Sequence, residues 1–213
     1  MGKGKLFVIS GASGVGKSTV LAKVMAERKD LTFSVSATTR APRDGEVEGV
    51  SYYFVTHEKF RQMIENDEFV EYDRHNAACY GTPLGQLEEK LEKGSVILDI
   101  EPNGAFAVRK ARPDATLVFL VPPTWDDLEV RIHNSKFIPE SEIAERLEIA
   151  KEEVLCADQY DYILINDTLE DTVRRFAQIV HGNRYSRNSM KSFLKSYIES
   201  EIKSELVDMI RSL

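Results

Sequence analysis

Short apolar segments recur along the chain, and each has the length of a buried β-strand. They cover residues 5–10, 32–36, 96–100, 116–121 and 162–165. Four of these segments lack the alternation of polar and apolar positions that a half-exposed strand shows. Continuous apolar strands are typical of a parallel sheet whose two faces are both covered.

Longer segments with the apolar spacing of amphipathic helices lie between most of these strands. They cover residues 17–28, 83–93, 103–112, 124–133, 140–157 and 169–181. Strands that alternate with helices indicate an α/β fold, because each crossover helix returns the chain to begin another parallel strand. We therefore predict a five-stranded, mostly parallel sheet with helices on both faces.

Residues 37–82 interrupt this alternation. The segment begins with a polar loop that contains Gly and Pro, and its pattern then predicts a strand near 52–55, a helix near 58–66 and a strand near 69–72. We interpret the segment as an inserted subdomain. The remaining chain is interpreted as a core formed by 1–36, 83–133 and 140–182, with a lid at 134–139.

The end of the chain, residues 183–213, follows the predicted core. From Met190 to Leu213 large apolar side chains recur on one stripe of a predicted helix. Such a stripe has to be covered, either by the same chain or by a second copy, so a monomer and a homodimer both remain open. Binding to a membrane surface is disfavoured because the polar face mixes both signs of charge.

The first apolar segment runs directly into a glycine-rich loop that reads Gly-Ala-Ser-Gly-Val-Gly-Lys-Ser. Glycines allow positive φ and close backbone approach, so that successive N–H groups surround phosphate oxygens. In such a loop the lysine reaches the β- and γ-phosphates and the serine hydroxyl ligates Mg²⁺. The helix that follows directs its positive end at the same anion. The pattern predicts a nucleoside triphosphate site formed by Gly11, Ala12, Ser13, Gly14, Val15, Gly16, Lys17, Ser18 and Thr19.

Composition narrows the classes of partner. The net charge of −7 disfavours general nucleic-acid binding, so phosphate chemistry has to depend on locally placed cations. The sequence shows neither an apolar run of membrane-spanning length nor a signal peptide. Cys79 and Cys156 lack the spacing of metal ligands. We expect a reduced, cytoplasmic protein without nucleic-acid or membrane partners.

A second group of cations lies in the polar loop of the inserted segment. Arg40 and Arg43 flank Pro42, and Ser36 and Tyr52 add hydroxyl donors nearby. Two guanidinium groups in a glycine-containing loop suit a second phosphate, because arginine grips oxyanions with two hydrogen bonds. The alternative is a solvated loop of scattered charges, since acidic residues are present too (Asp44, Glu46 and Glu48).

The same loop resembles the guanylate kinase family. Residues 38–54 match every fixed position of the family motif Thr-Thr-Arg-x-Pro-Arg-x-Gly-Glu-x-x-Gly-x-x-Tyr-x-Phe. The resemblance continues at 68–72, 80–83, 97–100 and 165–167, and covers roughly residues 4–182. It implies a core, a GMP-binding subdomain and a lid. It also implies transfer of a phosphoryl group from ATP to GMP, and to dGMP, with Mg²⁺.

The resemblance carries roles onto individual residues. The GMP phosphate is expected to bind Ser36, Arg40, Arg43, Tyr52 and Tyr80. Guanine is expected to be read by Glu71, Thr82 and Glu101, because a carboxylate accepts from the N1–H and N2–H₂ donors that adenine lacks.

Further expected roles concern ATP and the transferred group. Asn166 and Asp167 match a turn near the adenine, and Asp99 resembles a carboxylate close to Mg²⁺, together with Ser18. The catalytic cations are expected to be Lys17, Arg40, Arg131 and Arg146, of which the last two match arginines on the lid side.

The sequence departs from the family pattern at three places. Glu101 stands where the family has Asp, and Ala77-Ala78-Cys79 stands where it has Gly-Asn-Tyr. The Arg-Gly pair of the lid is replaced by Ser135-Lys136, and we interpret Lys136 as the replacement cation. These differences concern the rate and the lid more than the reaction.

Two other functions remain open. One is a related P-loop kinase for another phosphomonoester, such as a ribose bisphosphate. The other is a guanylate-kinase-like module that binds its partner without catalysis. The guanine-side residues argue against the first, and the intact Lys17 and Ser18 argue against the second.

Overall fold

The computed structural model describes residues 4–75, 77–135, 138–181, 195 and 198. The chain divides into two compact units. The first contains the described residues of Met1–Ile9 and Lys29–Thr116, and the second those of Ser10–Arg28 and Leu117–Leu213. Within the described part, each helix is too short or too polar to cross a membrane.

The predicted α/β fold is confirmed. Five strands form one sheet in the order β2-β7-β1-β8-β9, with the bounds Leu31–Phe33, Ser95–Asp99, Leu6–Gly11, Thr116–Val121 and Tyr162–Ile165. In the first unit, β1 and β2 both pair with β7 in parallel, and in the second unit β8 pairs with β9 in parallel. Strands β1, β7, β8 and β9 are largely buried, as their continuous apolar character predicts, whereas only Leu31 of β2 is buried.

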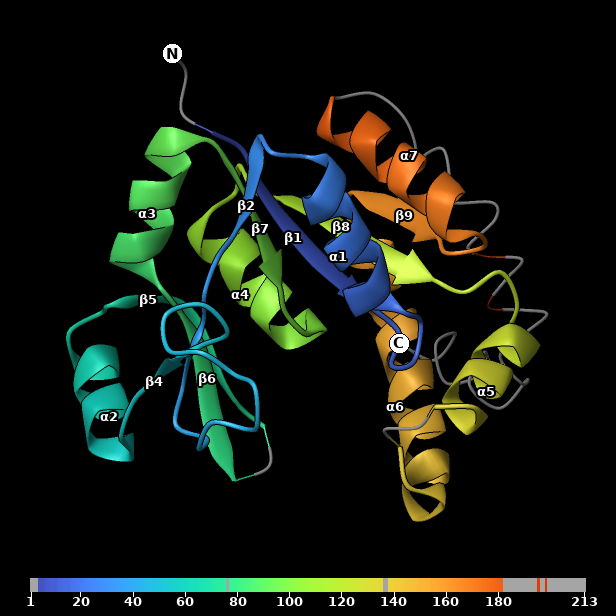
Figure 1. Ribbon diagram of the computed structural model, residues 1–213, viewed down its shortest axis with the longest axis horizontal. Helices are drawn as coiled ribbons and strands as arrows, with labels where there is room; N and C mark the ends of the chain where they lie inside the picture. Colours follow the sequence, from blue (N-terminus) through green and yellow to red (C-terminus); the bar gives the residue numbers. More distant parts are fainter. Residues whose placement is uncertain (1–3, 76, 136–137, 182–194, 196–197, 199–213) are drawn as a thin grey trace. The chain divides into compact units, whose positions relative to one another are not determined.

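The helices of the first unit are amphipathic and bury their apolar side chains in that unit. They are α2 (His57–Glu65), α3 (Leu84–Lys93) and α4 (Pro102–Ala111) (Figure 1). Leu87 and Leu91 are the buried residues of α3, which packs against β7. Helix α4 lies against β5 and begins with Pro102, whose fixed φ suits the first helical position.

The inserted segment contains a second sheet, in the order β4-β3-β6-β5. Its strands are Tyr53–Phe54, Ala37–Thr38, Ala78–Pro83 and Phe69–His75. Strand β6 pairs antiparallel with both β3 and β5. Sequence analysis missed β3 and β6. The first has only two residues, and the second reads Ala-Cys-Tyr-Gly-Thr-Pro, which lacks the β-branched apolar pattern of a strand. Helix α2 covers this sheet with Phe60 and Met63.

The second unit contains α1 (Lys17–Glu27), α5 (Trp125–His133), α6 (Ile143–Leu155) and α7 (Leu169–Val180). Helix α1 packs against α7, as Figure 1 also shows. The single helix predicted at 140–157 is divided. A 3₁₀ turn at Glu140–Glu142 precedes α6, and another at Cys156–Gln159 follows it.

Two predictions lie outside the described residues. One is the lid cation Lys136. The other is the apolar stripe from Met190 to Leu213, of which only Ile198 is described.

Candidate active site

The glycine-rich loop has the backbone that phosphate binding requires. Gly14 and Gly16 have φ of 81° and 92°, and Gly16 is the N-cap of α1 without a side-chain hydrogen bond at that cap. A Cβ on Gly14 would lie 2.4 Å from Cγ1 of Ile132. Positive φ and close packing explain why these positions are glycine, and the uncapped start of α1 suits an anion.

Three amides at the start of the loop are held by the protein itself. The Ala12 N–H donates to the Leu120 carbonyl at 3.2 Å, and the Val15 N–H donates to the Ala12 carbonyl at 2.9 Å. The Ser13 N–H donates to Oε2 of Glu153 on α6 at 2.6 Å. These bonds fix the loop before it enters α1. Sequence analysis missed Glu153, because nothing in the local pattern links it to a loop 140 residues away.

A pocket of about 320 Å³ lies beside this loop. It is lined by Gly14, Val15, Gly16, Thr19, Val20, Arg131, Asn166, Asp167 and Leu169. The fold therefore brings the loop together with three distant polar residues: Asn166 and Asp167, which were expected near the adenine, and Arg131, which was expected to act on the transferred group. The pocket combines apolar walls with a few polar groups, as nucleotide sites do.

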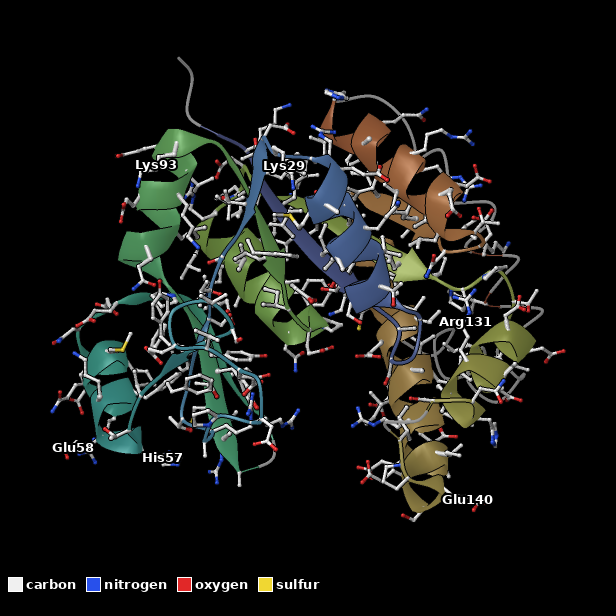
Figure 2. The ribbon with its side chains drawn as sticks, viewed as in Figure 1. Lys29, His57, Glu58, Lys93, Arg131 and Glu140 are labelled. Carbon is white, nitrogen blue, oxygen red and sulfur yellow. The ribbon has the colours of Figure 1, made fainter. Side chains whose placement is uncertain are left out.

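Arg131 and Asn166 both reach the main chain of the loop. Arg131, on α5 (Figure 2), donates from Nη1 to the Val15 carbonyl at 3.0 Å and from Nη2 to the Asn166 carbonyl at 2.9 Å. Asn166 donates from Nδ2 to the Val15 carbonyl at 2.7 Å, and the Thr172 hydroxyl donates to Oδ1 of Asn166 at 3.0 Å. Arg131 therefore braces the loop and also lines the pocket.

Asp167 is held by Arg175 of α7, a residue that sequence analysis missed. Two parallel hydrogen bonds of 2.7 Å join the guanidinium to both carboxylate oxygens. The Arg175 guanidinium, helped by the Thr168 N–H, lowers the pKa of Asp167, so its carboxylate is charged at neutral pH. A pair eight residues apart across a turn has no periodic signal in the sequence.

Arg146 lies elsewhere in the second unit. It is on α6, where its Nη2 is 3.9 Å from Oε2 of Glu142, and both side chains are more than 40% exposed. Unlike Arg131, it is not among the described residues that line the pocket.

In the first unit, Arg40 is held by a carboxylate and by aromatic rings. Its Nη2 and Nη1 donate to the two Glu46 oxygens at 2.8 and 2.9 Å. Its Cζ lies 5.3 Å from the centre of the Tyr52 ring, which meets the Tyr80 ring edge-on at 6.0 Å.

The hydrogen bonds to Glu46 raise the pKa of Arg40. The Arg40 guanidinium and then the Arg43 N–H lower the pKa of Glu46 to about 2. Burial raises the pKa of the Tyr52 hydroxyl.

Glu71 and Thr82 form a buried pair. They are directly opposite in the β5–β6 ladder, and the Thr82 hydroxyl donates to Oε1 of Glu71 at 2.6 Å. Burial raises the pKa of Glu71, and the Thr82 hydrogen bonds oppose this shift. Oε2 lies close to α4, because a Cβ on Gly104 would be 3.0 Å from it. A buried carboxylate with a fixed orientation is suited to accept hydrogen bonds from a nucleobase edge.

Three further site residues also belong to the first unit: Asp99, which was expected near Mg²⁺, and Glu101 and Ser36, which were expected on the GMP side. Asp99 is the last residue of β7, Glu101 is the N-cap of α4, and the Ser36 carbonyl accepts from the Tyr53 N–H at 2.9 Å. The second unit contains Ser18, which was expected to share Mg²⁺ with Asp99.

Comparisons of the sequence with a family model and with individual proteins agree with one another. The sequence matches the model of the family described as guanylate kinase over residues 3–183. It is 44% identical to a guanylate kinase of Trichodesmium erythraeum over 181 residues, which is 84% of this chain and 97% of that protein. It is 46% identical to a guanylate kinase of Thermus thermophilus over 184 residues, 85% of this chain and 83% of that protein.

A solved structure is similar as well. The crystal structure of guanylate kinase from Anaplasma phagocytophilum matches with a TM-score of 0.67 and 32% sequence identity, and the match covers 84% of this chain and 85% of that one.

Proposed function

We propose which residues carry the reaction, from the premise that this chain belongs to the guanylate kinase family. As a member, it transfers the γ-phosphoryl group of ATP to GMP and gives ADP and GDP. The single observation that carries the assignment of residues is the buried, oriented Glu71–Thr82 pair, because a phosphate-binding loop alone does not choose an acceptor.

ATP is proposed to bind in the second unit. Its phosphates lie against the loop from Gly11 to Thr19 and the uncapped start of α1, with Lys17 on the β- and γ-phosphates. Its base and ribose occupy the pocket beside the loop, near Asn166 and Asp167. Arg131 serves twice, since it braces the loop and presents a positive charge at the pocket wall.

GMP, and by the same contacts dGMP, is proposed to bind in the first unit. The phosphate is held by Ser36, Arg40, Arg43, Tyr52 and Tyr80. The guanine edge donates to Glu71, with Glu101 as a second acceptor and Thr82 as the group that orients the Glu71 carboxylate. Adenine presents no matching pair of donors, so it would leave the buried carboxylate without partners, which is costly.

Mg²⁺ fits the available donors. Ser18 and Asp99 supply a hydroxyl and a carboxylate, the hard oxygen ligands that Mg²⁺ takes along with water and substrate phosphates. When bound, the ion neutralises charge on the ATP phosphates. Since Ser18 and Asp99 belong to different units, their joint role is a proposal.

The protein is proposed to act by positioning and charge. Phosphoryl transfer spreads negative charge over the transferred group, and fixed cations lower the energy of that state. Lys17, Arg40, Arg131 and Arg146 are the proposed cations. A general base is not required by this mechanism.

The acceptor assignment is tested by measuring ADP formation with GMP, dGMP, AMP, UMP and a ribose bisphosphate. We expect turnover with GMP and dGMP and far lower turnover with the others. Comparable turnover with AMP or with the ribose bisphosphate would refute the assignment of Glu71. The comparisons favour neither the ribose bisphosphate kinase nor the non-catalytic module.

Location and assembly are also proposals. Cys79 and Cys156 are free thiols, which suits a reducing, cytoplasmic location. Monomer and homodimer differ in concentration dependence, because only a dimer gains thermal stability as protein concentration rises. Light scattering together with Tm measured over a range of concentrations decides between them.

A further inference from the structure

The loop that carries Arg40 and Arg43 closes in a tight turn that returns Glu46 to both arginines. The Glu46 N–H donates to the Arg43 carbonyl at 3.1 Å, and Gly45, the third residue of the turn, has φ of 84°. A positive φ at that position is typical of a type II turn, and glycine adopts it without strain. The turn therefore brings the main chain of Glu46 back beside Arg43.

Both oxygens of Glu46 are used inside this loop. Oε1 accepts from Nη2 of Arg40, and Oε2 accepts from Nη1 of Arg40 and from the Arg43 N–H at 2.7 Å. The Arg40 and Glu46 side chains are only 17% and 20% exposed. A paired geometry with this much shielding holds a guanidinium far better than an exposed surface pair does.

The position of Arg40 is fixed in two further ways. Its Nη1 also donates to the Ala41 carbonyl at 2.8 Å, and its Cζ lies over the Tyr52 ring. The ion pair with Glu46 occupies the edge formed by Nη1 and Nη2. A guanidinium has a second edge, formed by Nε and the outer hydrogen of Nη2, that binds an oxyanion with the same two-bond geometry.

We propose that Glu46 is a positioning residue for the acceptor phosphate. It remains paired with Arg40 while GMP is bound, so that the second edge of the guanidinium meets the phosphate without reorganisation. The inference rests on the proposed role of Arg40 at the GMP phosphate. Glu46 itself does not touch GMP, because a carboxylate in contact with a phosphate would repel it. Preorganisation of this kind increases affinity by reducing the ordering cost of binding.

A different role for Glu46 would change GMP affinity in the opposite direction. If Glu46 stands in the place of the phosphate and has to leave when GMP binds, then removal of its charge strengthens GMP binding. The two roles are therefore separated by whether loss of the Glu46 charge weakens or strengthens GMP binding, with guanosine, which lacks the phosphate, as the reference ligand.

The experiment measures the Kd of GMP by calorimetry and the Kd of guanosine by NMR titration, on the full chain. We expect Glu46→Gln to raise the Kd of GMP about tenfold, because the amide presents N–H donors to the guanidinium and the ion pair is lost. Guanosine binding should not change, since guanosine has no phosphate for Arg40 to hold. Asp44→Asn is the matched control, because it removes the same charge from an exposed position of the same loop. It should leave both values unchanged.

Three results would overturn the inference: tighter GMP binding, unchanged GMP binding, or equal weakening of GMP and guanosine, which indicates general damage to the subdomain. If Glu46→Gln unfolds, Glu46→Asp keeps the charge on a shorter side chain and gives the same comparison. Arg40→Ala separates this inference from the proposed function. If Arg40→Ala spares GMP binding, the assignment of Arg40 is wrong. If it weakens GMP while Glu46→Gln does not, only the positioning role fails.

Discussion

The Glu153 carboxylate on α6 accepts a hydrogen bond of 2.6 Å from the Ser13 N–H of the phosphate loop. The contact ties the loop to a helix that begins far along the chain. It also means that this amide is directed at the protein, as is the Val15 amide, whereas the amides after Val15 belong to the uncapped start of α1.

We predict that Glu153→Ala lowers kcat/KM for ATP about five- to twentyfold, because a buried or half-buried amide without its charged acceptor costs about 1–2 kcal/mol. Thermal unfolding should also shift to lower temperature. Glu152→Ala is the control, since Glu152 is the exposed neighbour on the same helix. Glu153→Gln should lower kcat/KM for ATP less than Glu153→Ala does, because it keeps an acceptor oxygen. Wild-type kinetics for Glu153→Ala would show that the contact does not shape the loop.

Lys17→Ala should reduce kcat by about 10²–10³-fold, because it removes a cation from the phosphates on which charge develops. The fold should be retained, since Lys17 is a partly exposed residue at the first position of α1. Steady-state kinetics and circular dichroism on the same preparation test both statements. Near-normal turnover in a folded variant would refute the role of the loop.

Glu71→Gln should lower kcat/KM for GMP, because the amide nitrogen opposes a guanine donor. The decrease should correspond to a loss of about 2–4 kcal/mol in transition-state stabilisation. The KM for ATP should change little. Kinetics with each substrate varied in turn measure the difference. Equal losses for both substrates would indicate a folding defect.

The same substitution should not destabilise the protein at neutral pH. Burial raises the pKa of Glu71 in the folded state, so the folded chain binds a proton more readily than the unfolded chain does. The contribution of this group to stability therefore falls as pH rises from its ordinary pKa through its raised pKa. Glu71→Gln removes this loss and can still accept from Thr82. We expect its Tm to equal or exceed the wild-type Tm at pH 7, with the advantage reduced at acidic pH. A clearly lower Tm at pH 7 contradicts this account.

Gly104→Ala should weaken GMP binding several-fold, because its Cβ would lie 3.0 Å from Oε2 of Glu71 and 3.3 Å from Cδ1 of Ile100. The carboxylate then has to move by a few tenths of an ångström. Gly85→Ala is the control, since it also lies in the first turn of a helix but its Cβ would meet nothing within 4 Å. Alanine should raise helix propensity at both sites, so only Gly104→Ala should change the Kd of GMP, measured by calorimetry. Equal effects of the two substitutions on the Kd of GMP would show that the close approach of Gly104 to Glu71 does not affect GMP binding.

The departures from expectation all concern contacts that the local sequence pattern does not reveal. Sequence analysis named Glu46 only among the acidic residues behind the alternative of a solvated loop and gave it no role of its own, whereas the structure pairs it with Arg40. It missed β6 because that strand lacks an apolar pattern of its own and is defined by its partners β3 and β5. Arg131 was expected from the resemblance to act on the transferred group, and its observed bonds to the main chain of Val15 and Asn166 add a bracing role.

The sequence by itself determined the features that depend on neighbouring residues. Strand β1, the glycine loop and α1 are consecutive, and glycine, lysine and serine at fixed spacing specify both the backbone and its phosphate chemistry. The tertiary structure alone decided which distant groups support them. Glu153 meets Ser13, Arg175 fixes Asp167 and Thr82 orients Glu71 only after helices and strands have packed. The reason is physical: local propensity and periodicity depend on the next few residues, but a buried hydrogen bond depends on which side chains the packed core brings within about 3 Å.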